Sequence, residues 1–306
     1  MIARSKASLP LILAAGGGIA AAATWRKLAA ARTRRRLLER GEIRELREVW
    51  KRVGSYRVFA RVGDTVRRND SPPVVLVHGW GMSSAYWVPA AERLASDFAV
   101  YVPDLPGHGR SDTPLKPFSI RFLARVLFRW MNAMGLVRVA LMGHSMGCQI
   151  AAEAALQDPA RVDRLVLIGL ASDPQGRTVT DQIRRLVGGS VYERPALGRH
   201  SARDLLRVGR RLVPEFRFMM DDRVEEKLPK IAQPVLLVRG EKDRIAPQRW
   251  IDEAAQLLPN GRVTVIPRWG HAVQFSAPGE TVAAIRPFLR ERLRGGAGST
   301  PFAPHA

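Results

Sequence analysis

A serine between two glycines, Gly143-His144-Ser145-Met146-Gly147, constrains the fold of this chain more than any other stretch. An apolar run at 137–142 precedes it, and a run of small residues at 148–156 follows it. This order predicts a strand, a tight turn and a helix. The glycines remove side chains that would collide in so sharp a turn, and the hydroxyl of Ser145 is held clear of the backbone. The helix start supplies unpaired N–H groups and a positive dipole end, which suit negative charge developing on an oxygen.

Other short apolar runs recur along the chain with helical stretches between them, at 74–77, 98–102, 164–168, 235–238 and 263–266. Continuous apolar runs of this length are typical of strands that are buried on both faces, so a mostly parallel sheet is predicted. The chain has 306 residues and 46% hydrophobic residues, which is enough to build a large core and excludes global disorder.

Four motifs, in this order along the chain, resemble those of α/β-hydrolase-fold proteins over residues 50–293. The expected architecture is therefore the α/β-hydrolase fold of the serine-triad, esterase- or lipase-like branch: a mostly parallel central sheet flanked by helices, with a helical cap insertion. Cys148 departs from the pattern, because relatives often have a further glycine there. The motifs are His78-Gly79-Trp80-Gly81, Asp104-Leu105-Pro106-Gly107-His108-Gly109-Arg110-Ser111, the serine pentapeptide, and the pair Gly240-Glu241-Lys242-Asp243 and Gly270-His271.

The catalytic residues expected from these motifs are Ser145, Asp243 and His271. A serine hydroxyl is a weak nucleophile unless a base removes its proton, and His271 is the candidate base. The imidazole needs a carboxylate on its other nitrogen to fix the tautomer and stabilise the cation. Asp243 follows a predicted strand and fits that place, with Asp173 as the alternative acid. The order serine, aspartate, histidine matches the α/β-hydrolase order.

The resemblance also implies an oxyanion hole made of two backbone N–H groups, those of Trp80 and Met146. Three other histidines stand in the motifs. His144 is expected to be structural, because its side chain points away from the serine hydroxyl. His78 and His108 are expected to brace loops.

A long insertion is expected between the strands near Leu170 and Pro234, and in this family such an insertion is the cap that roofs the site. An arginine-rich run in it is either a solvated face or a dock for an acidic partner or an anionic headgroup. Gly188-Gly189 either allow the cap to move or end a helix. The arginines of the run are Arg184, Arg185, Arg194, Arg199, Arg203, Arg207, Arg210, Arg211 and Arg217.

The net charge of +21 is unevenly placed. Residues 1–57 hold 14 Lys and Arg against 4 Asp and Glu, a net charge of +10. Such a balance suits anionic lipid surfaces, nucleic acid or acidic partners, or reflects solubility in an arginine-rich proteome. Ser8–Trp25 has 18 residues without charge, and basic residues follow it at once. A membrane anchor with the hydrolase domain in the cytoplasm is predicted, and a cleaved signal peptide with secretion is the alternative.

The expected domain organisation has five parts. A basic helix is expected over residues 26–52, with Ile43, Leu46, Val49 and Trp50 in one stripe, and Gly54-Ser55 either ends it or forms a hairpin. The parts are an N-terminal apolar segment (1–30), a basic helix or linker (31–52), the hydrolase core (53–170 and 234–294), the helical cap (171–233) and a disordered tail (295–306).

The predicted function is hydrolysis of carboxylic esters through an acyl-enzyme, with a small-molecule or lipid acyl ester as substrate. Alternatives are an acyl-carrier-protein methyl-ester or thioester hydrolase with a basic cap, a cofactor-free perhydrolase, a carbon–carbon bond hydrolase, and a membrane-tethered binding protein that retains the fold. An anionic membrane surface or an acidic carrier protein is a candidate partner. No cofactor and no metal are expected, since no two histidines stand at ligand spacing and Cys148 is the single cysteine. No nucleic-acid-binding module is recognised.

Overall fold

The computed structural model describes residues 24–25, 28–64 and 71–291. The chain divides into two compact units, Met1–Glu45 and Leu46–Ala306. The predicted apolar segment from Ser8 lies outside the described residues except for its last two positions, and the predicted tail at 295–306 lies entirely outside them.

The described part of the first unit contains a helix over residues 28–39, and the chain then turns at Gly41 with φ 68°. An ion pair of 2.8 Å between the exposed side chains of Arg35 and Glu39 joins successive turns of this helix. None of the helices in the described parts of the chain has the length and hydropathy needed to cross a bilayer.

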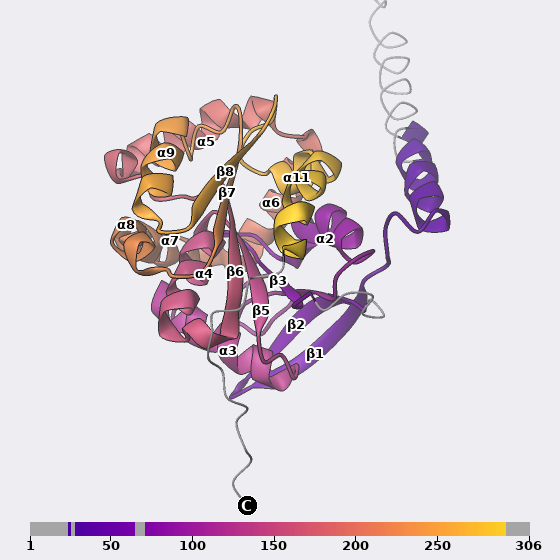
Figure 1. The fold of residues 1–306 in the computed structure, drawn as a ribbon, viewed down its shortest axis with the longest axis horizontal. Coiled ribbons are helices and arrows are strands. Elements are labelled where there is room, and N and C mark those ends of the chain that lie inside the picture. Colours follow the sequence, from indigo (N-terminus) through magenta and orange to yellow (C-terminus); the bar gives the residue numbers. More distant parts are fainter. Residues whose placement is uncertain (1–23, 26–27, 65–70, 292–306) are drawn as a thin grey trace, which may run out of the picture. The chain divides into compact units, whose positions relative to one another are not determined.

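The second unit is built on one eight-stranded sheet in the order β1-β2-β4-β3-β5-β6-β7-β8. All neighbours from β4 to β8 are parallel, whereas β1–β2 and β2–β4 are antiparallel, so the predicted mostly parallel sheet is confirmed. Figure 1 shows the twist of this sheet and the helices on both of its faces. The strands are β1 Arg47–Val53, β2 Tyr56–Gly63, β3 Val74–Val77, β4 Val100–Pro103, β5 Val139–His144, β6 Val162–Ile168, β7 Val235–Gly240 and β8 Gly261–Ile266.

The expectation of a basic helix up to residue 52 is wrong beyond residue 39, because residues 40–46 form a turn and a loop and residues 47–52 belong to strand β1. The pairing of Val53 with Tyr56 leaves Gly54 and Ser55 as a two-residue hairpin turn, with Gly54 at φ 59°. Trp50 lies opposite Phe59 in this pairing, and their rings meet edge to face at 5.3 Å. Cross-strand pairing therefore overrides the helical spacing of the apolar residues.

Successive residues of the central strands point to opposite faces of the sheet, and each face has its own core. Val75 and Leu141 belong to one buried cluster, and Leu76 and Met142 belong to the other. Helices α3 (Ile120–Ala133), α4 (Met146–Gln157) and α9 (Gln248–Leu257) cover the first cluster, and α2 (Val88–Leu94) and α11 (Pro278–Arg290) cover the second. Because both faces are covered, the strands read as continuous apolar runs in the sequence.

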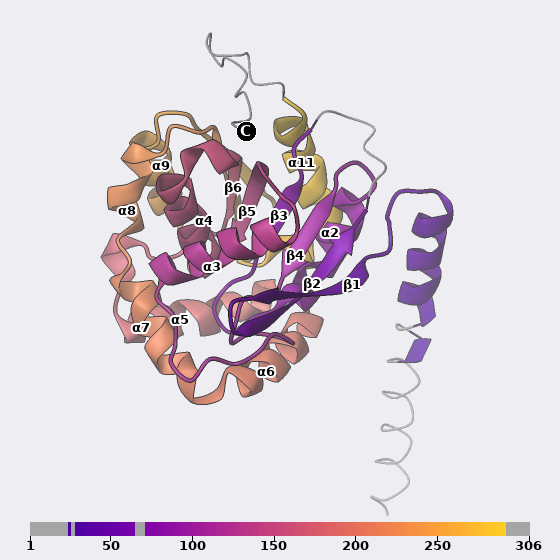
Figure 2. The same ribbon diagram turned by 90° about the horizontal axis from the view of Figure 1, so that it is seen from below.

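The stretch between β6 and β7 is helical, as expected for residues 171–233, and is called the insertion below. Figure 2 shows α5, α6 and α7 together along one side of the second unit. The helices of the insertion are η3 Pro174–Gly176, α5 Val179–Gly189, η4 Ser190–Tyr192, α6 Pro195–Val208, η5 Gly209–Arg211, α7 Leu212–Asp221, α8 Val224–Lys227 and η6 Leu228–Lys230. The remaining short helices are η1 Ser84–Trp87, η2 Pro159–Arg161 and α10 Val273–Ser276.

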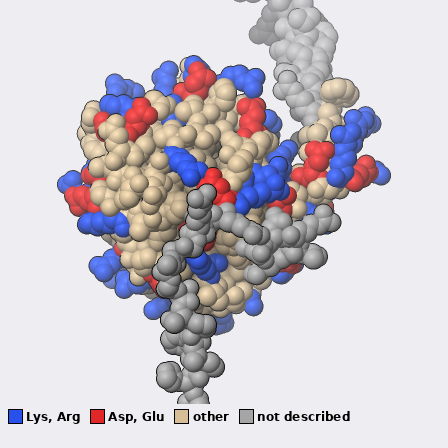
Figure 3. Space-filling model, viewed as in Figure 1, with Lys and Arg blue, Asp and Glu red and all other residues tan. Residues whose placement is uncertain are grey.

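Charged side chains of the second unit are mixed on the face drawn in Figure 3. Lys and Arg form separate groups around its outline, and Asp and Glu stand between them. On this face the described residues present no continuous basic stripe of the kind that follows a nucleic-acid backbone.

Leu141→Ala tests the central position of β5 in the core. Leu141 is fully buried between Val75 of β3 and Leu165 of β6, so its truncation is expected to lower the free energy of unfolding by about 2–5 kcal/mol. Val137→Ala, at a residue that is 80% exposed just before β5, should change it by less than about 0.5 kcal/mol. Chemical denaturation measures both values, and equal losses would contradict this account of the core.

Candidate active site

Ser145 lies at the sharp turn between β5 and α4, in a backbone conformation that side chains rarely adopt. Its φ is 54° and its ψ is −120°. Such a conformation costs on the order of 1–3 kcal/mol and persists only where the surroundings hold it. One such restraint is the hydrogen bond that the Ser145 N–H donates to the Ile168 carbonyl at the end of β6, at 3.0 Å. The predicted strand, turn and helix are therefore present.

The two glycines of the pentapeptide are required by close backbone approach. A Cβ on Gly143 would lie 2.3 Å from the Gly147 carbonyl oxygen, and a Cβ on Gly147 would lie 2.3 Å from the carbonyl oxygen of Val77 in β3. Both neighbours are backbone atoms that cannot rotate away. Any side chain here would push the turn away from the neighbouring strand.

His271 and Asp243 meet as the sequence predicts, although they come from different loops. The Nδ1 of His271 lies 2.8 Å from the Oδ2 of Asp243, and the carboxylate is fully buried. Gly169, which directly follows β6, makes room for the ring, because a Cβ there would lie 2.8 Å from two atoms of the imidazole. Ile168, the residue before Gly169, ends β6 and accepts the N–H of Ser145. The histidine ring therefore lies at the end of β6, beside the serine turn.

The carboxylate of Asp243 is fixed by hydrogen bonds on both oxygens. Its Oδ1 accepts the N–H groups of Ile245 and Ala246, at 2.8 and 3.0 Å, and its Oδ2 faces His271. An ionised carboxylate only accepts hydrogen bonds, so the shared proton belongs on Nδ1 and leaves Nε2 as the basic nitrogen. This Nε2 is buried and has no hydrogen-bond partner among the described residues.

Burial and neighbouring charges act in opposite directions on the pKa of His271. Burial lowers it, whereas attraction to Asp243, the hydrogen bond to Asp243 and the nearby Glu193 raise it, and the net result is a raised pKa. Deprotonation of the free imidazole therefore requires a more alkaline solution than for an ordinary histidine.

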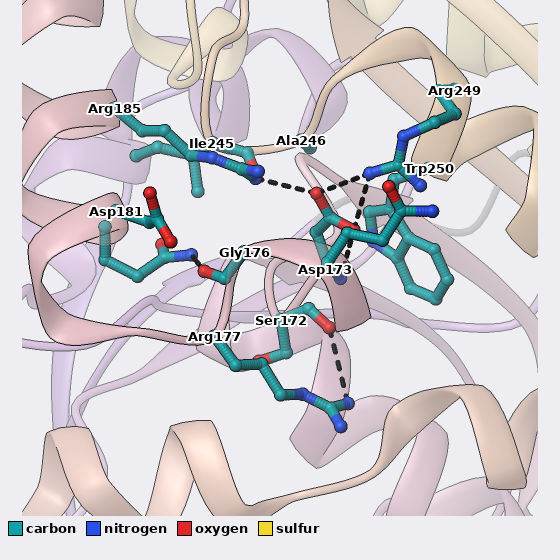
Figure 4. A network of polar contacts seen from close by, with 12 residues as sticks. Ser172, Asp173, Gly176, Arg177, Asp181, Arg185, Ile245, Ala246, Arg249 and Trp250 are labelled. Atoms are coloured by element: carbon teal, nitrogen blue, oxygen red, sulfur yellow. Dashed lines mark hydrogen bonds and ion pairs between the residues drawn. The ribbon is translucent and has the colours of Figure 1, made fainter.

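Asp173, the alternative acid, is engaged in a different network (Figure 4). Its two carboxylate oxygens accept hydrogen bonds from Arg185 at 2.8 Å and from Arg249 at 2.7 and 2.8 Å. Burial raises the pKa of Asp173, but these two guanidinium groups outweigh it, and the pKa lies below its usual value. This arrangement favours Asp243 over Asp173 as the partner of His271.

His144 links the histidine loop to the loop after β3. Its Nε2 lies 3.2 Å from the His271 carbonyl oxygen and its Nδ1 lies 2.9 Å from the Tyr86 hydroxyl. Because the carbonyl can only accept, Nε2 carries the proton and Nδ1 accepts from Tyr86, whose oxygen accepts the Gly79 N–H at 3.0 Å. Burial, and then the neighbouring His271, holds the pKa of His144 well below its usual value, so this histidine is neutral.

The loop after β3 closely approaches the serine. A Cβ on Gly79 would lie 3.2 Å from the Cβ of Ser145. The next residue, Trp80, directs its indole toward the insertion, where Nε1 donates to the Leu212 carbonyl at 2.9 Å. The backbone N–H groups of Trp80 and of Met146, the first residue of α4, stay predictions as oxyanion donors.

His78 and His108 are buried and contact other loops. His78 accepts the Leu105 N–H on Nε2 at 3.1 Å and contacts the Gly79 carbonyl through Nδ1 at 2.9 Å. Burial, helped by the neighbouring His108, lowers the pKa of His78 to about 3. His108 lies with its ring 4.6 Å from that of His78 and its Nε2 3.3 Å from Glu215 of the insertion.

Glu193 is a site residue that the sequence analysis missed. Its Oε1 accepts the N–H of Ala272, which follows His271, at 2.9 Å, and its Oε2 accepts the Ser276 hydroxyl at 2.6 Å. A Cβ on Gly270 would lie 2.5 Å from Oε1. Burial raises the pKa of Glu193 above its usual value. In the sequence Glu193 is one acidic residue in an arginine-rich run, and nothing in its spacing marks this contact.

The described residues offer no metal centre: within 24–25, 28–64 and 71–291, no three His, Cys, Asp or Glu side chains are placed to share an ion.

Comparison with known proteins agrees with the fold and with the serine turn described above. Residues 72–193 match the family model described as "alpha/beta hydrolase fold", and residues 218–295 match the one described as "TAP-like protein". An uncharacterized protein of Mycobacterium tuberculosis is 27% identical over 277 residues, 78% of this chain and 79% of that protein. The pimeloyl-[acyl-carrier protein] methyl ester esterase of Nitrosomonas europaea is 29% identical over 247 residues, 71% of this chain and 95% of the esterase.

Solved structures of similar fold are also described as enzymes that act on esters. A crystal structure described as a membrane phospholipase A, a novel bacterial virulence factor, superposes with a TM-score of 0.69 at 26% identity, covering 91% of this chain and 95% of that one. An esterase from Thermogutta terrifontis superposes with a TM-score of 0.63 at 24% identity, covering 81% and 98%. Sheet order, serine turn and matched families agree, and the chain belongs to the α/β-hydrolase superfamily.

Proposed function

We propose that this protein is a serine hydrolase of carboxylic esters, with Ser145 as nucleophile, His271 as base and Asp243 as the acid that orients the base. The observation that carries the proposal is the buried His271–Asp243 contact of 2.8 Å, which leaves Nε2 of the histidine unpaired among the described residues beside the serine turn. A nucleophile, a base and a group that orients the base are the three parts that acyl transfer needs.

In the proposed acylation step, Oγ of Ser145 attacks the ester carbonyl carbon while Nε2 of His271 takes the hydroxyl proton. The negative charge moves to the carbonyl oxygen, where the backbone N–H groups of Trp80 and Met146 would stabilise it. When the carbon–oxygen bond breaks, the alcohol leaves with the proton from Nε2, and an acyl-serine remains. Water then attacks the acyl group, again losing its proton to Nε2, and the carboxylic acid and free serine are released.

Two relatives suggest different esters. One is named as a methyl ester esterase acting on an acyl-carrier-protein substrate, and another is described as a membrane phospholipase A. Thioester, perhydrolase and carbon–carbon bond chemistry remain alternatives for the same residues, and a membrane-tethered binding protein is the non-enzyme alternative. A carboxylic ester fits both named relatives, and we therefore propose it.

The arginine-rich run could attract an acidic carrier protein or an anionic headgroup, but two of its arginines are already engaged in contacts within the protein. Arg211 is only 8% exposed and donates to the Gly107 carbonyl, and Arg207 donates to the Gly109 carbonyl at 3.2 Å. Both hold the insertion to the loop after β4. Long-range attraction of an anionic substrate would therefore rest on the arginines of the run that stay exposed, which include Arg184, Arg199, Arg203, Arg210 and Arg217.

If the proposed triad acts as a unit, the losses of activity caused by replacing its members should not be additive. Ser145→Ala and His271→Ala should each lower kcat for a p-nitrophenyl ester by roughly 10⁴-fold or more, and Asp243→Asn should also lower it by orders of magnitude. The double variant of Ser145 and His271 should lose little more than either single one. A fluorophosphonate probe should label the wild type and the control Ser96→Ala but not Ser145→Ala. Labelling of Ser145→Ala would refute the assignment.

Glu193→Gln should move the pH profile to more acidic pH. The negative charge of Glu193 helps to raise the pKa of His271, and the base acts only when neutral. Glutamine keeps the size of the side chain but removes the charge, so the acidic limb of kcat/KM should shift to lower pH. Glu253→Gln on α9, whose carboxylate pairs with Arg249, is the matched control and should leave the limb in place. An unshifted limb in Glu193→Gln would contradict the electrostatic role.

Membrane attachment through residues 8–25, with the hydrolase domain in the cytoplasm, is also proposed. It is supported by the uncharged composition of Ser8–Trp25 and by the basic residues that follow it. The full chain should sediment with membranes and resist carbonate extraction. A chain that starts near Arg44 should be soluble and retain its activity on small esters. A mature N-terminus near Thr24 in a secreted fraction would establish the alternative, a cleaved leader.

A further inference from the structure

Helix α5 (Val179–Gly189) directs two polar side chains, those of Gln182 and Arg185, toward the protein. Gln182 is buried and its side-chain amide donates to the Gly176 carbonyl. Arg185 has a side chain that is only 17% exposed, and it reaches Asp173 at 2.8 Å (Figure 4). The inner side of this helix is thus held by hydrogen bonds and an ion pair.

The opposite side of α5 is aliphatic and exposed. The exposed fractions are 57% for Val179, 57% for Ile183, 54% for Leu186 and 66% for Val187. Their spacing of four, three and one residues places them along one face of the helix. We call these four residues the α5 stripe. Val191, in the following turn η4, is 76% exposed and extends the same apolar region along the chain.

Exposed aliphatic residues are concentrated in this part of the protein. Of the sixteen large hydrophobic residues that are exposed in the described parts of the chain, eight lie between residues 179 and 218. Single exposed apolar residues are normal on a protein surface, but a contiguous stripe marks an interaction site. Within residues 24–25, 28–64 and 71–291, nothing covers the α5 stripe.

The surrounding charge selects the kind of surface that would cover it. Residues 179–218 contain nine arginines against four acidic residues, so their net charge is +5. Arg184 lies within the helix and its side chain is 78% exposed. A second copy of a chain with a net charge of +21 would be repelled. Aliphatic side chains among arginines match the surface of an anionic bilayer, which offers acyl chains beneath negative headgroups.

We propose that the α5 stripe lies in the interfacial region of an anionic lipid bilayer. The helix rests on the headgroup–acyl boundary with its aliphatic side inward, and exposed arginines of the insertion contact the headgroups. The chain then runs from Val191 to Glu193, which binds the loop of His271. A membrane-bound α5 therefore places an ester of a membrane lipid next to the proposed active site. Only this last statement rests on the proposed function.

A fluorophore at one position of the stripe tests the contact directly in the full chain. Cys148 is fully buried, so a thiol-reactive, environment-sensitive dye should label the single exposed cysteine of Ile183→Cys. Val137→Cys is the matched control, because Val137 is 80% exposed and lies just before β5. With vesicles of phosphatidylglycerol and phosphatidylcholine, we expect a blue shift of the emission at position 183 and none at position 137. Vesicles of phosphatidylcholine alone should give a smaller shift.

Three results would overturn the proposal. No shift at position 183 with anionic vesicles would show that the stripe does not meet the bilayer. Equal shifts at 183 and 137 would show contact without preference for α5. A blue-shifted emission at position 183 before vesicles are added would show that a protein surface already covers the stripe. Light scattering, which measures the oligomeric state, would then show whether that surface belongs to a second copy of the chain.

A second measurement separates this proposal from the proposed esterase activity. In Ile183→Asp/Val187→Asp, hydrolysis of an ester embedded in anionic vesicles should fall by roughly tenfold or more, since two aliphatic contacts are replaced by anions. Hydrolysis of a water-soluble ester should be unchanged, which also shows that the variant is folded. If the wild type hydrolyses neither ester, the proposed function fails while the fluorescence result still stands. Equal loss on both esters, with native circular dichroism, would count against docking through α5.

Discussion

The left-handed backbone of Ser145 is the constraint on which the rest of the site depends. It requires β3, β5 and the start of α4 to approach so closely that neither Gly143 nor Gly147 has room for a Cβ. The serine turn is therefore held in place only while β3, β5 and β6 lie side by side. The two buried cores on either side of the sheet supply the restraint, because they fix the strands whose carbonyls, at Val77 and Ile168, meet the turn.

The same strand ends position the histidine and its acid. Gly169 leaves space for the imidazole, and the turn after β7 holds Asp243 by two backbone N–H groups. A buried imidazole would ordinarily lose basicity. Here two carboxylates, of Asp243 and Glu193, reverse that effect and raise the pKa of His271. Because Glu193 belongs to the insertion, the position of the insertion and the basicity of the histidine are physically linked.

The insertion is attached to the core through both apolar and polar contacts, since Met219, Val224 and Leu228 are buried in the same core cluster as strands β3 and β5. Arg249 of α9 binds Asp173 of the insertion, and Arg211 and Arg207 bind carbonyls of the loop after β4. Interpreting the arginine-rich run as a solvated face is thus correct for its exposed members and wrong for Arg185, which pairs with Asp173, and for the buried Arg211. With arginines committed to the inner side of the insertion, aliphatic residues are left on the outer side of α5.

The sequence alone determined the α/β architecture, since continuous apolar runs and a glycine-flanked serine are local signals of buried parallel strands and a sharp turn. It also pointed to Ser145, Asp243 and His271, whose roles stay predictions, through motifs in chain order. Only the tertiary structure decided that residues 47–52 pair as a strand, that Asp173 is engaged by two arginines and that Glu193 contacts the histidine loop. These outcomes depend on contacts between residues far apart in the chain. Local spacing carries no information about such contacts.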